Sequence, residues 1–345
     1  MKIVIIGLGS IGQRHLRNLI KIFPNYEIIA VRKKKYTPLL NNKNEIISGT
    51  IEKKYKIKVF DSLKSAFKEK PTVAYICNPT SLHINYAIKC AQEKIHIFLE
   101  KPLSNKFVNI NKFIEIVRKN KIICMIGFQL RFNPAVRYIK KILKDNKIGE
   151  IIGGNIYNGE YLPNFHRYEE YKQSYASREK LGGGVVLTQI HEIDFCNYFF
   201  GLPSSIYATG GKLSKLDIDV EDYSNSILSY TSKNKKKFSI NLTLDYLQNP
   251  PYRKSIIVGT DGTIFWDYFN SSVQINYYSG KKILKKFKTK DRNEMFIAEI
   301  KHFIHCIKKK QIPISNITDG IETLKIALAI KKSMENNKIV YMKNK

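Results

Sequence analysis

Three glycines near the amino terminus have the spacing that lets a chain bind a dinucleotide. They directly follow a short apolar run and open a helical segment. In such a unit the first glycine makes a tight turn, the second lets the backbone approach a pyrophosphate, and the third lets helix and strand pack closely, while the helix N-terminus faces the anion. This context favours a binding loop over a chance glycine turn. The residues assigned to this site are Gly7, Gly9, Ser10, Ile11 and Gly12.

A cationic cluster follows the second apolar run, where NAD-binding domains usually offer Asp or Glu to the ribose 2′-hydroxyl. This chain has Arg32 there, followed by Lys33, Lys34 and Lys35. These groups could bind a 2′-phosphate, and a hydrogen bond to a charged group contributes roughly 1.5 to 3 kcal/mol. We therefore expect Arg32 and Lys33 to contact the cofactor, with NADP favoured and NAD possible. The alternative is that these lysines belong to a general excess and solvate a loop.

Short apolar runs alternate with helix-like segments through the first third of the chain, and these elements must hold the glycine-rich turn. Continuous apolar runs separated by helical crossovers are typical of a parallel sheet covered on both faces. We predict a doubly wound α/β domain over residues 1–126. Its expected strands are residues 3–6, 27–31, 73–77, 95–99 and 122–126.

Further along the chain, apolar residues alternate with polar ones, as in strands with one face in solvent. Residues 238–244 are an example. We predict an α+β domain over residues 127–345, with an open, mostly antiparallel sheet and a late helix that opens at Asp319. Its other expected strands are residues 225–230, 255–258, 263–266 and 273–278.

Length and composition are those of a folded protein with two domains. The chain has 345 residues, more than one hydrophobic core usually organises. Its content of 43% hydrophobic and 12% aromatic residues excludes disorder. The formal charge of +30 could indicate nucleic acid, a membrane surface or an anionic ligand. Because the lysines are spread along the whole sequence without a dense basic arm, we favour a compositional bias.

The five cysteines are odd in number and widely spaced, with no CxxC pair. We interpret them as reduced core thiols and expect no metal site. The apolar start stops at Gly7, too short for a signal peptide, and no later stretch reaches transmembrane length. These observations predict a cytoplasmic protein.

Further motifs run through the chain. They are Asn78-Pro79-Thr80 with His83, Glu100-Lys101-Pro102, residues 127–134 (GFQLRFNP), three glycines at 182–184 before His191, and the turn at 259–262. With the glycine-rich turn they give nearly the whole chain a resemblance to the glucose-fructose oxidoreductase and inositol dehydrogenase family (Gfo/Idh/MocA). The resemblance implies a Rossmann domain followed by an open-faced sheet domain that often mediates oligomers, with the nicotinamide at their junction.

Two loops at the carboxyl ends of predicted strands are expected to border the cofactor, because α/β sheets bind ligands at this edge. In the family the lysine of the Glu-Lys-Pro motif, here Lys101, hydrogen-bonds the reacting hydroxyl or carbonyl. Beside a cationic nicotinamide in a partly dry cleft, its ammonium should lose its proton more readily. The cofactor-loop residues implied by the resemblance are Asn78, Pro79, Thr80, His83, Glu100 and Lys101.

The resemblance assigns His191, on a predicted helix over residues 185–200, as the general base. The family usually has an aspartate four residues earlier, where this chain has Leu187. Gln189 could replace that substrate-holding carboxylate, or the carboxylate could come from another segment. Asp194 could orient the His191 ring or be a helix residue paired with the basic surface.

Other polar or amphipathic side chains lie in segments that the family places near the sugar, although each one alone is more typical of a structural residue. Besides Gln189, the candidate substrate contacts are Arg131, Asn133, Tyr161 and Arg178, with His166 and Tyr175 in the same segments.

The function that we expect is NAD(P)-dependent transfer of a hydride between nicotinamide and a secondary alcohol or ketone. Its substrate would be a sugar, amino sugar, nucleotide sugar or cyclitol, with surface-glycan biosynthesis as one setting. The expected partners are this substrate and further copies of the chain, in a homodimer or homotetramer, without membrane or nucleic acid. One alternative is an NAD-dependent glycosidase of the same fold, which would show no net cofactor turnover. Another is a non-catalytic cofactor-sensing or polyanion-binding protein, whose polyanion binding would depend on salt.

Overall fold

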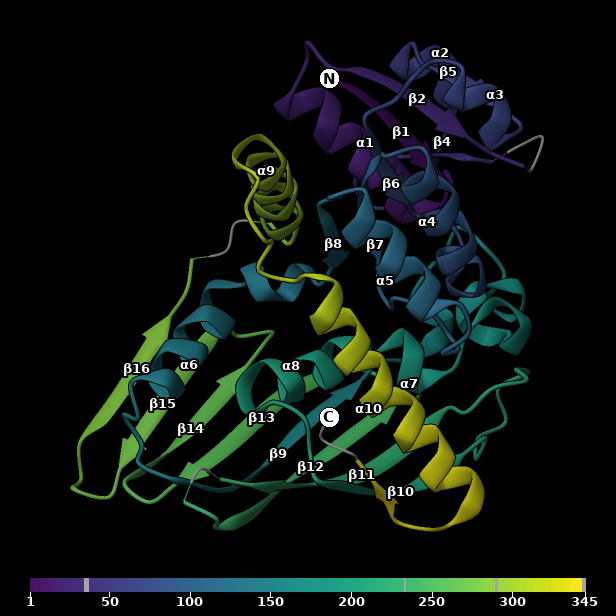
Figure 1. Ribbon diagram of the computed structural model, residues 1–345. Coiled ribbons are helices and arrows are strands. Elements are labelled where there is room, and N and C mark those ends of the chain that lie inside the picture. Colours follow the sequence, from purple (N-terminus) through teal and green to yellow (C-terminus); the bar gives the residue numbers. More distant parts are fainter. Residues whose placement is uncertain (34–36, 233, 289–290, 343–345) are drawn as a thin grey trace.

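The computed structural model describes residues 1–33, 37–232, 234–288 and 291–342. Lys34 and Lys35 of the cationic cluster lie outside the described residues. Figure 1 shows a smaller sheet with its helices above a larger sheet, whose lower face carries none of the described helices.

The first sheet holds six parallel strands whose order reverses at its centre. The strands are β1 (Lys2–Ile6), β2 (Glu27–Val31), β5 (Lys58–Phe60), β6 (Val73–Ile76), β7 (His96–Glu100) and β8 (Cys124–Gly127). They are ordered β5-β2-β1-β6-β7-β8. Because the order reverses between β1 and β6, the loops after these two strands lie side by side at the carboxyl edge. A separate pair is formed by β3 (Leu39–Leu40) and β4 (Ile46–Ile47).

Helices cover both faces of this sheet, which explains its continuous apolar runs. Alternate residues of β1 belong to different hydrophobic clusters, Ile3 and Ile5 to the one that contains Leu16 of α1, and Val4 to the one that contains Phe113 of α5. The predicted doubly wound sheet is confirmed. The helices are α1 (Ser10–Ile22), α2 (Ile51–Tyr55), α3 (Leu63–Phe67), α4 (His83–Gln92) and α5 (Ile110–Lys119).

The second sheet is nine-stranded and mostly antiparallel, as predicted. Its strands are β9 (Ile151–Gly159), β10 (Ser205–Gly211), β11 (Tyr223–Thr231), β12 (Lys237–Asp245), β13 (Tyr252–Gly259), β14 (Gly262–Asp267), β15 (Ser272–Tyr277), β16 (Lys282–Lys286) and β17 (Val340–Tyr341). Their order is β16-β15-β14-β13-β9-β12-β11-β10-β17, and only the pairing of β9 with β12 is parallel among the described strands. Residues alternate along β11 between buried and more exposed positions.

Helices lie on one face of this second sheet and face the first (Figure 1). They are α6 (Pro134–Lys144), α7 (Val185–Thr188), α8 (Ile190–Phe200) and α10 (Ile317–Asn336). The helix predicted over residues 185–200 is therefore interrupted. Gln189 leaves helical geometry at φ −92° and ψ 32°, and its Nε2 donates to the Asp245 backbone oxygen over 2.8 Å. After this break α8 begins at Ile190, one residue before His191.

The chain returns to the first sheet after the second one is complete. Helix α9 (Asn293–Lys309) packs beside α1, where Asn18 Nδ2 donates to Asn293 Oδ1 over 3.0 Å. Ser315 Oγ then donates to the Ile126 backbone oxygen on β8 over 2.7 Å. The predicted late helix begins at Ile317, slightly earlier than expected, because Asn316 caps it in a capping box with Asp319. The boundary at residues 126 and 127 stays a prediction.

All five cysteines are buried free thiols, as expected. Among the described helices, none combines the length and apolar character needed to cross a bilayer.

Candidate active site

Gly7 and Gly12 of the glycine-rich loop lie against backbone atoms, whereas the space beside Gly9 is open. Gly7 has φ +96°, and a Cβ there would lie 2.8 Å from the Cys77 backbone oxygen. A Cβ on Gly12 would lie 2.0 Å from the Gly7 oxygen, whereas one on Gly9 would meet no protein atom within 4 Å. Helix α1 starts at Ser10 without an acidic residue in its first turn. The loop therefore fits a dinucleotide pyrophosphate.

The loop after β6 lies beside this turn and offers an unpaired amide. Both side-chain polar atoms of Asn78 are buried without a protein partner among the described residues. Pro79 precedes Thr80, which is 2% exposed and starts a short 3₁₀ turn. A buried amide without a partner is costly, so Asn78 is suited to contact a bound ligand.

His83 lies behind the cofactor loops. Its Nε2 lies 2.8 Å from the Asn78 backbone oxygen and its Nδ1 lies 2.7 Å from that of Pro102. The side chain thus ties the loop after β6 to the loop after β7. This differs from the direct cofactor contact predicted for His83, because both ring nitrogens are occupied by backbone carbonyls.

Arg32 is paired with a carboxylate at the end of β2. Its Nη2 lies 2.5 Å from Oε1 of Glu52 on α2, and Lys33 beside it is exposed. An acidic group is therefore present near the expected ribose position, although it comes from a helix rather than from the strand end. The expected preference for NADP is not supported by this arrangement, because Glu52 competes for the guanidinium that would bind a 2′-phosphate.

Lys101 directly follows β7 and reaches across to the second domain. Its Nζ donates to the backbone oxygen of Thr188 on α7 over 2.7 Å. Burial lowers the pKa of Lys101 to about 8, while the neighbouring carboxylate of Glu100 acts in the opposite direction. An amine with such a pKa exchanges a proton near neutral pH.

His191 lies in the first turn of α8, three residues after the carbonyl that holds Lys101. Its Nε2 lies 3.0 Å from Gln129 Nε2, which can only donate, so the contact suits a neutral ring. Burial and then the charge of Lys101 lower the pKa of His191 well below its usual value. Lys101 and His191 are thus brought together at the junction of the two sheets.

The aspartate usual in the family is replaced by a buried apolar residue. Leu187 is 2% exposed in α7, and the backbone oxygen of Thr188 binds Lys101. A carboxylate nearby belongs to Glu192, whose Oε1 accepts from Arg253 Nε over 2.6 Å and whose charge acts on Lys101. Sequence reasoning missed Glu192, Arg253 and Gln129.

Arg131 and Asp194 form a buried ion pair. Arg131 donates to both Asp194 carboxylate oxygens, over 2.6 and 3.0 Å, and lies 3.0 Å from Asp319. Arg131 and Asp194 are each 1% exposed. The prediction that Arg131 contacts substrate is therefore corrected, because its guanidinium holds α8 and α10 together. Asp194 neither orients the His191 ring nor pairs with the surface.

The remaining substrate candidates have structural contacts. Asn133 caps α6, where its Oδ1 accepts from the Ala135 N–H over 2.8 Å, and its substrate contact stays a prediction. Arg178 lies 3.5 Å from Asp219 near the surface. Tyr161 is partly buried against the core, and Gln189 is 4% exposed beside Asp245.

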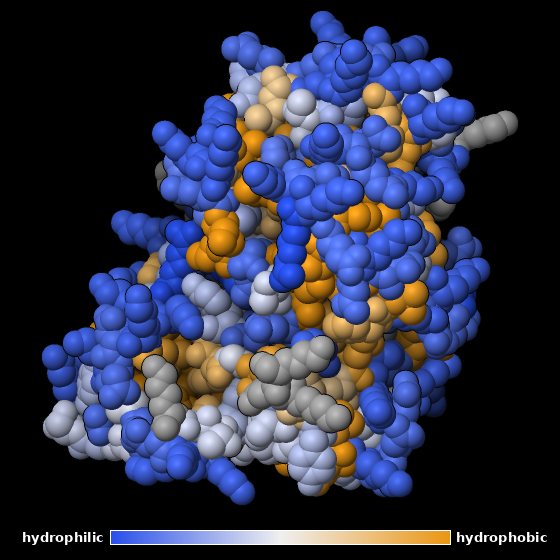
Figure 2. Space-filling model, viewed as in Figure 1, coloured by the Kyte–Doolittle hydropathy of each residue, from blue (hydrophilic) through white to orange (hydrophobic). Residues whose placement is uncertain are grey.

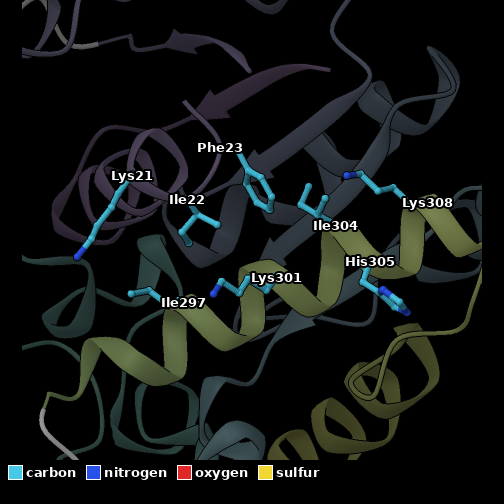
Figure 3. Close-up of a pocket in the computed structure, with 8 residues that line it drawn as sticks. All are labelled: Lys21, Ile22, Phe23, Ile297, Lys301, Ile304, His305 and Lys308. Atoms are coloured by element: carbon cyan, nitrogen blue, oxygen red, sulfur yellow. The ribbon is translucent and has the colours of Figure 1, made fainter. Parts of the chain in front are cut away.

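A concavity elsewhere on the molecule contains none of the predicted site residues. Figure 3 shows it between the end of α1 and one face of α9. Figure 2 shows hydrophilic side chains over most of the viewed face, with hydrophobic residues exposed in small patches among them. The concavity is lined by Lys21, Ile22, Phe23, Ile297, Lys301, Ile304, His305 and Lys308.

These features define the class as a protein whose first sheet has a loop that fits a dinucleotide and whose second sheet lies behind Lys101 and His191. A model described as the oxidoreductase family with NAD-binding Rossmann fold matches residues 1–128, and a GFO/IDH/MocA C-terminal domain model matches residues 136–265. The chain belongs to the Gfo/Idh/MocA family of NAD(P)-dependent oxidoreductases.

A curated relative and two solved structures resemble this chain along nearly their whole length. The scyllo-inositol 2-dehydrogenase (NAD(+)) of Bacillus subtilis is 25% identical, covering 97% of this chain and 94% of the relative. A levoglucosan dehydrogenase in complex with NADH superposes with a TM-score of 0.84 at 19% identity, covering both chains fully at 100%. The WlbA dehydrogenase of Bordetella pertussis in complex with NADH and UDP-GlcNAcA has a TM-score of 0.80 at 17% identity, covering 100% of this chain and 99% of the other.

Proposed function

We propose that this chain is a dehydrogenase that interconverts a secondary alcohol and a ketone on a sugar or cyclitol, with Lys101 and His191 as its catalytic residues. The observation that carries the proposal is their meeting at the junction of the two sheets, beside the loops that fit a dinucleotide. Bound nicotinamide would supply the hydride chemistry.

The two side chains suit complementary parts of the proton movement. During oxidation of the alcohol, the carbon loses a hydride to the nicotinamide and the hydroxyl loses a proton. A neutral imidazole at His191 accepts that proton, since its lowered pKa keeps the ring uncharged at neutral pH. Lys101, with a pKa of about 8, donates a hydrogen bond to the same oxygen.

The substrate class rests on the relatives, which are named for cyclitol, anhydrosugar and nucleotide-sugar ligands. A cyclitol has the first place in our proposal because the inositol dehydrogenase matches almost the whole chain. For the cofactor we propose NAD(H) as the first choice, with discrimination against NADP(H) set by the Arg32 and Glu52 pair. The buried thiols are consistent with work in the reducing cytoplasm.

We also propose that the uncovered face of the second sheet joins copies of this chain. Strand register places five exposed apolar side chains and three polar ones in one transverse row across that face. Several large apolar side chains exposed on one sheet face are typical of a protein interface. The transverse row runs through Tyr207, Ile227, Asn241, Asn155, Ile256, Phe265, Gln274 and Leu284.

The test is turnover of NAD⁺ with myo-inositol, scyllo-inositol, levoglucosan and UDP-N-acetylglucosamine, followed by absorbance of NADH. We expect activity with at least one polyol, and a loss of roughly 100-fold or more in kcat for Lys101→Met and for His191→Gln. Lys106→Met, an exposed lysine on the same loop, is the matched control and should keep full activity.

Each other outcome points to a different function. Glycoside cleavage without net NADH would favour the glycosidase of the same fold. Failure to bind any nicotinamide cofactor, with salt-sensitive binding of a polyanion, would replace the enzyme by a binding protein. Equal losses in Lys106→Met and Lys101→Met would contradict the special role of Lys101.

A further inference from the structure

A buried histidine and carboxylate lie directly behind Lys101. His15 Nε2 lies 2.7 Å from Glu100 Oε1, and the His15 side chain is 0% exposed and that of Glu100 8% exposed. The second carboxylate oxygen of Glu100 accepts the backbone N–H of Lys101 over 3.2 Å. The pair therefore ends at the residue that carries the proposed catalytic amine.

This pair also joins two elements of the cofactor site. His15 lies on the buried side of α1, the helix that starts at the glycine-rich loop, and Glu100 is the last residue of β7. Gly127 at the end of β8 leaves room for the carboxyl group, since a Cβ there would lie 3.2 Å from the Glu100 Cδ. The aromatic rings of Tyr75 and Phe98 pack against the His15 ring. Packing on every side fixes the geometry of the pair.

The negative charge of this region rests on Glu100. Burial raises the pKa of Glu299 on α9 well above its usual value, with the charge of Glu100 acting in the same direction, which favours the neutral form of Glu299. Neither carboxyl oxygen of Glu299 has a protein partner among the described residues. The other groups that feel the charge of Glu100 are Arg14, Cys77, His83, Lys101 and Tyr175, and those that act on Lys101 or His191 besides Glu100 are Glu192, Arg253 and Arg292.

We propose that His15 and Glu100 are positioning residues for Lys101, and that they hold its backbone to helix α1 and keep its amine protonated through the fixed negative charge of Glu100. The inference rests on the proposed function of Lys101. It adds that the position and the protonation of the Lys101 amine are set by two groups behind it that do not touch the substrate. Removal of that charge should make the ammonium lose its proton at lower pH.

The direct test is the protonation midpoint of the Lys101 amine in the full chain. Trace acetylation with acetic anhydride at a series of pH values, read by mass spectrometry of the peptide that contains Lys101, gives this midpoint without any substrate. We expect a wild-type midpoint near pH 8. In Glu100→Gln, which keeps the shape of the side chain, it should fall by about one pH unit. Glu299→Gln is the matched control and should leave it unchanged.

A second pair of variants keeps the test valid if Glu100→Gln does not fold. His15→Leu removes the hydrogen bond that stabilises the ionised carboxylate, so the Lys101 midpoint should fall, and His15→Gln should restore it. A wild-type midpoint near that of an ordinary lysine would contradict the proposed site itself. A wild-type Lys101 midpoint near pH 8 that does not move in Glu100→Gln or His15→Leu would overturn the positioning role and leave the proposed function intact.

Discussion

Lys101 and His191 differ in how their surroundings prepare them for proton movement. Lys101 is desolvated but keeps a carbonyl acceptor at Thr188 and a carboxylate behind it. His191 is desolvated beside that cation, so the two groups disfavour simultaneous charging. One protonated amine next to one neutral imidazole is the arrangement that an alcohol oxidation needs, with a hydrogen-bond donor and a proton acceptor for the same oxygen.

Cofactor choice is a prediction at the scale of single residues. Glu52→Gln removes the ionic partner of Arg32 and frees its guanidinium for a 2′-phosphate. NADPH binding should then tighten roughly tenfold, the effect of one charge-assisted hydrogen bond, and Arg32→Ala should abolish that gain. Nicotinamide fluorescence titrations with NADH and NADPH measure both affinities.

Glu115→Gln, at an exposed position of α5, raises the net charge by the same one unit and serves as the control for a mere change in net charge. If Glu52→Gln weakens NADH binding and gives NADPH no advantage, then Glu52 acts on the ribose directly and the Arg32 pair does not decide the preference.

The sequence predicts the site residues that lie within one short motif. It does not predict partners that come from distant parts of the chain. The three glycines act within one turn, and the Glu100-Lys101 motif lies at one strand end, so spacing and family resemblance suffice. Glu52 reaches Arg32, and Arg253 reaches Glu192, only because the fold brings distant segments together. Arg131 is a charged residue in a promising segment, and nothing local shows that Asp194 buries it.

At the scale of elements, the strands with strong apolar patterns are predicted and the weaker ones are missed. β9 contains Gly153, Gly154 and two asparagines, which hide its pattern although it pairs with both β12 and β13. β5 has three residues and a charged start. The helix over residues 185–200 is periodic enough to be seen, but its break at Gln189 depends on a hydrogen bond to the distant strand β12.

Helix α9 allows a prediction about stability and pH through Glu299. A carboxyl whose pKa is raised on folding contributes stability that is fully present below the unfolded value of about 4.3 and is lost as pH rises towards the folded value. The loss is about 1.4 kcal/mol for each pH unit in that window. The stability of Glu299→Gln relative to wild type should therefore rise with pH above about 4.3, which a comparison of about pH 5 with about pH 8 tests.

Denaturant unfolding at the two pH values measures this difference. Glu294→Gln, on the same helix but exposed, is the control and should follow the wild type. A gap between Glu299→Gln and wild type that stays constant with pH would mean that Glu299 does not change its protonation on folding.

At the scale of the whole molecule, the two faces of the second sheet differ in what they carry. One face of the second sheet carries the helices that hold His191 and the support for Lys101, and it meets the first sheet (Figure 1). The opposite face carries the transverse row. An association of copies through the transverse row would leave the catalytic junction untouched.

The transverse row predicts the oligomeric state. Phe265 in this row is 37% exposed and lies opposite Ile256 on the neighbouring strand. Phe265→Glu would place a charge in the apolar contact, so we expect smaller assemblies by light scattering coupled to size-exclusion chromatography. Ile312→Glu, at a position that is 80% exposed outside the sheet, should not change the mass. An unchanged mass for Phe265→Glu would place the interface elsewhere.

The return of α9 to the first sheet has a consequence for synthesis on the ribosome. The six strands of that sheet are complete once Gly127 has been made, yet Phe303 of α9 supplies the ring that packs on Tyr75 and Phe98. Until the ribosome reaches α9, the growing chain carries an uncovered aromatic surface while the whole second sheet is still being added. Nascent chains with exposed apolar surface are prone to aggregate and are bound by chaperones. The synthesis of α9 therefore sets the time at which the aromatic surface of the first sheet can be covered and the risk of aggregation falls.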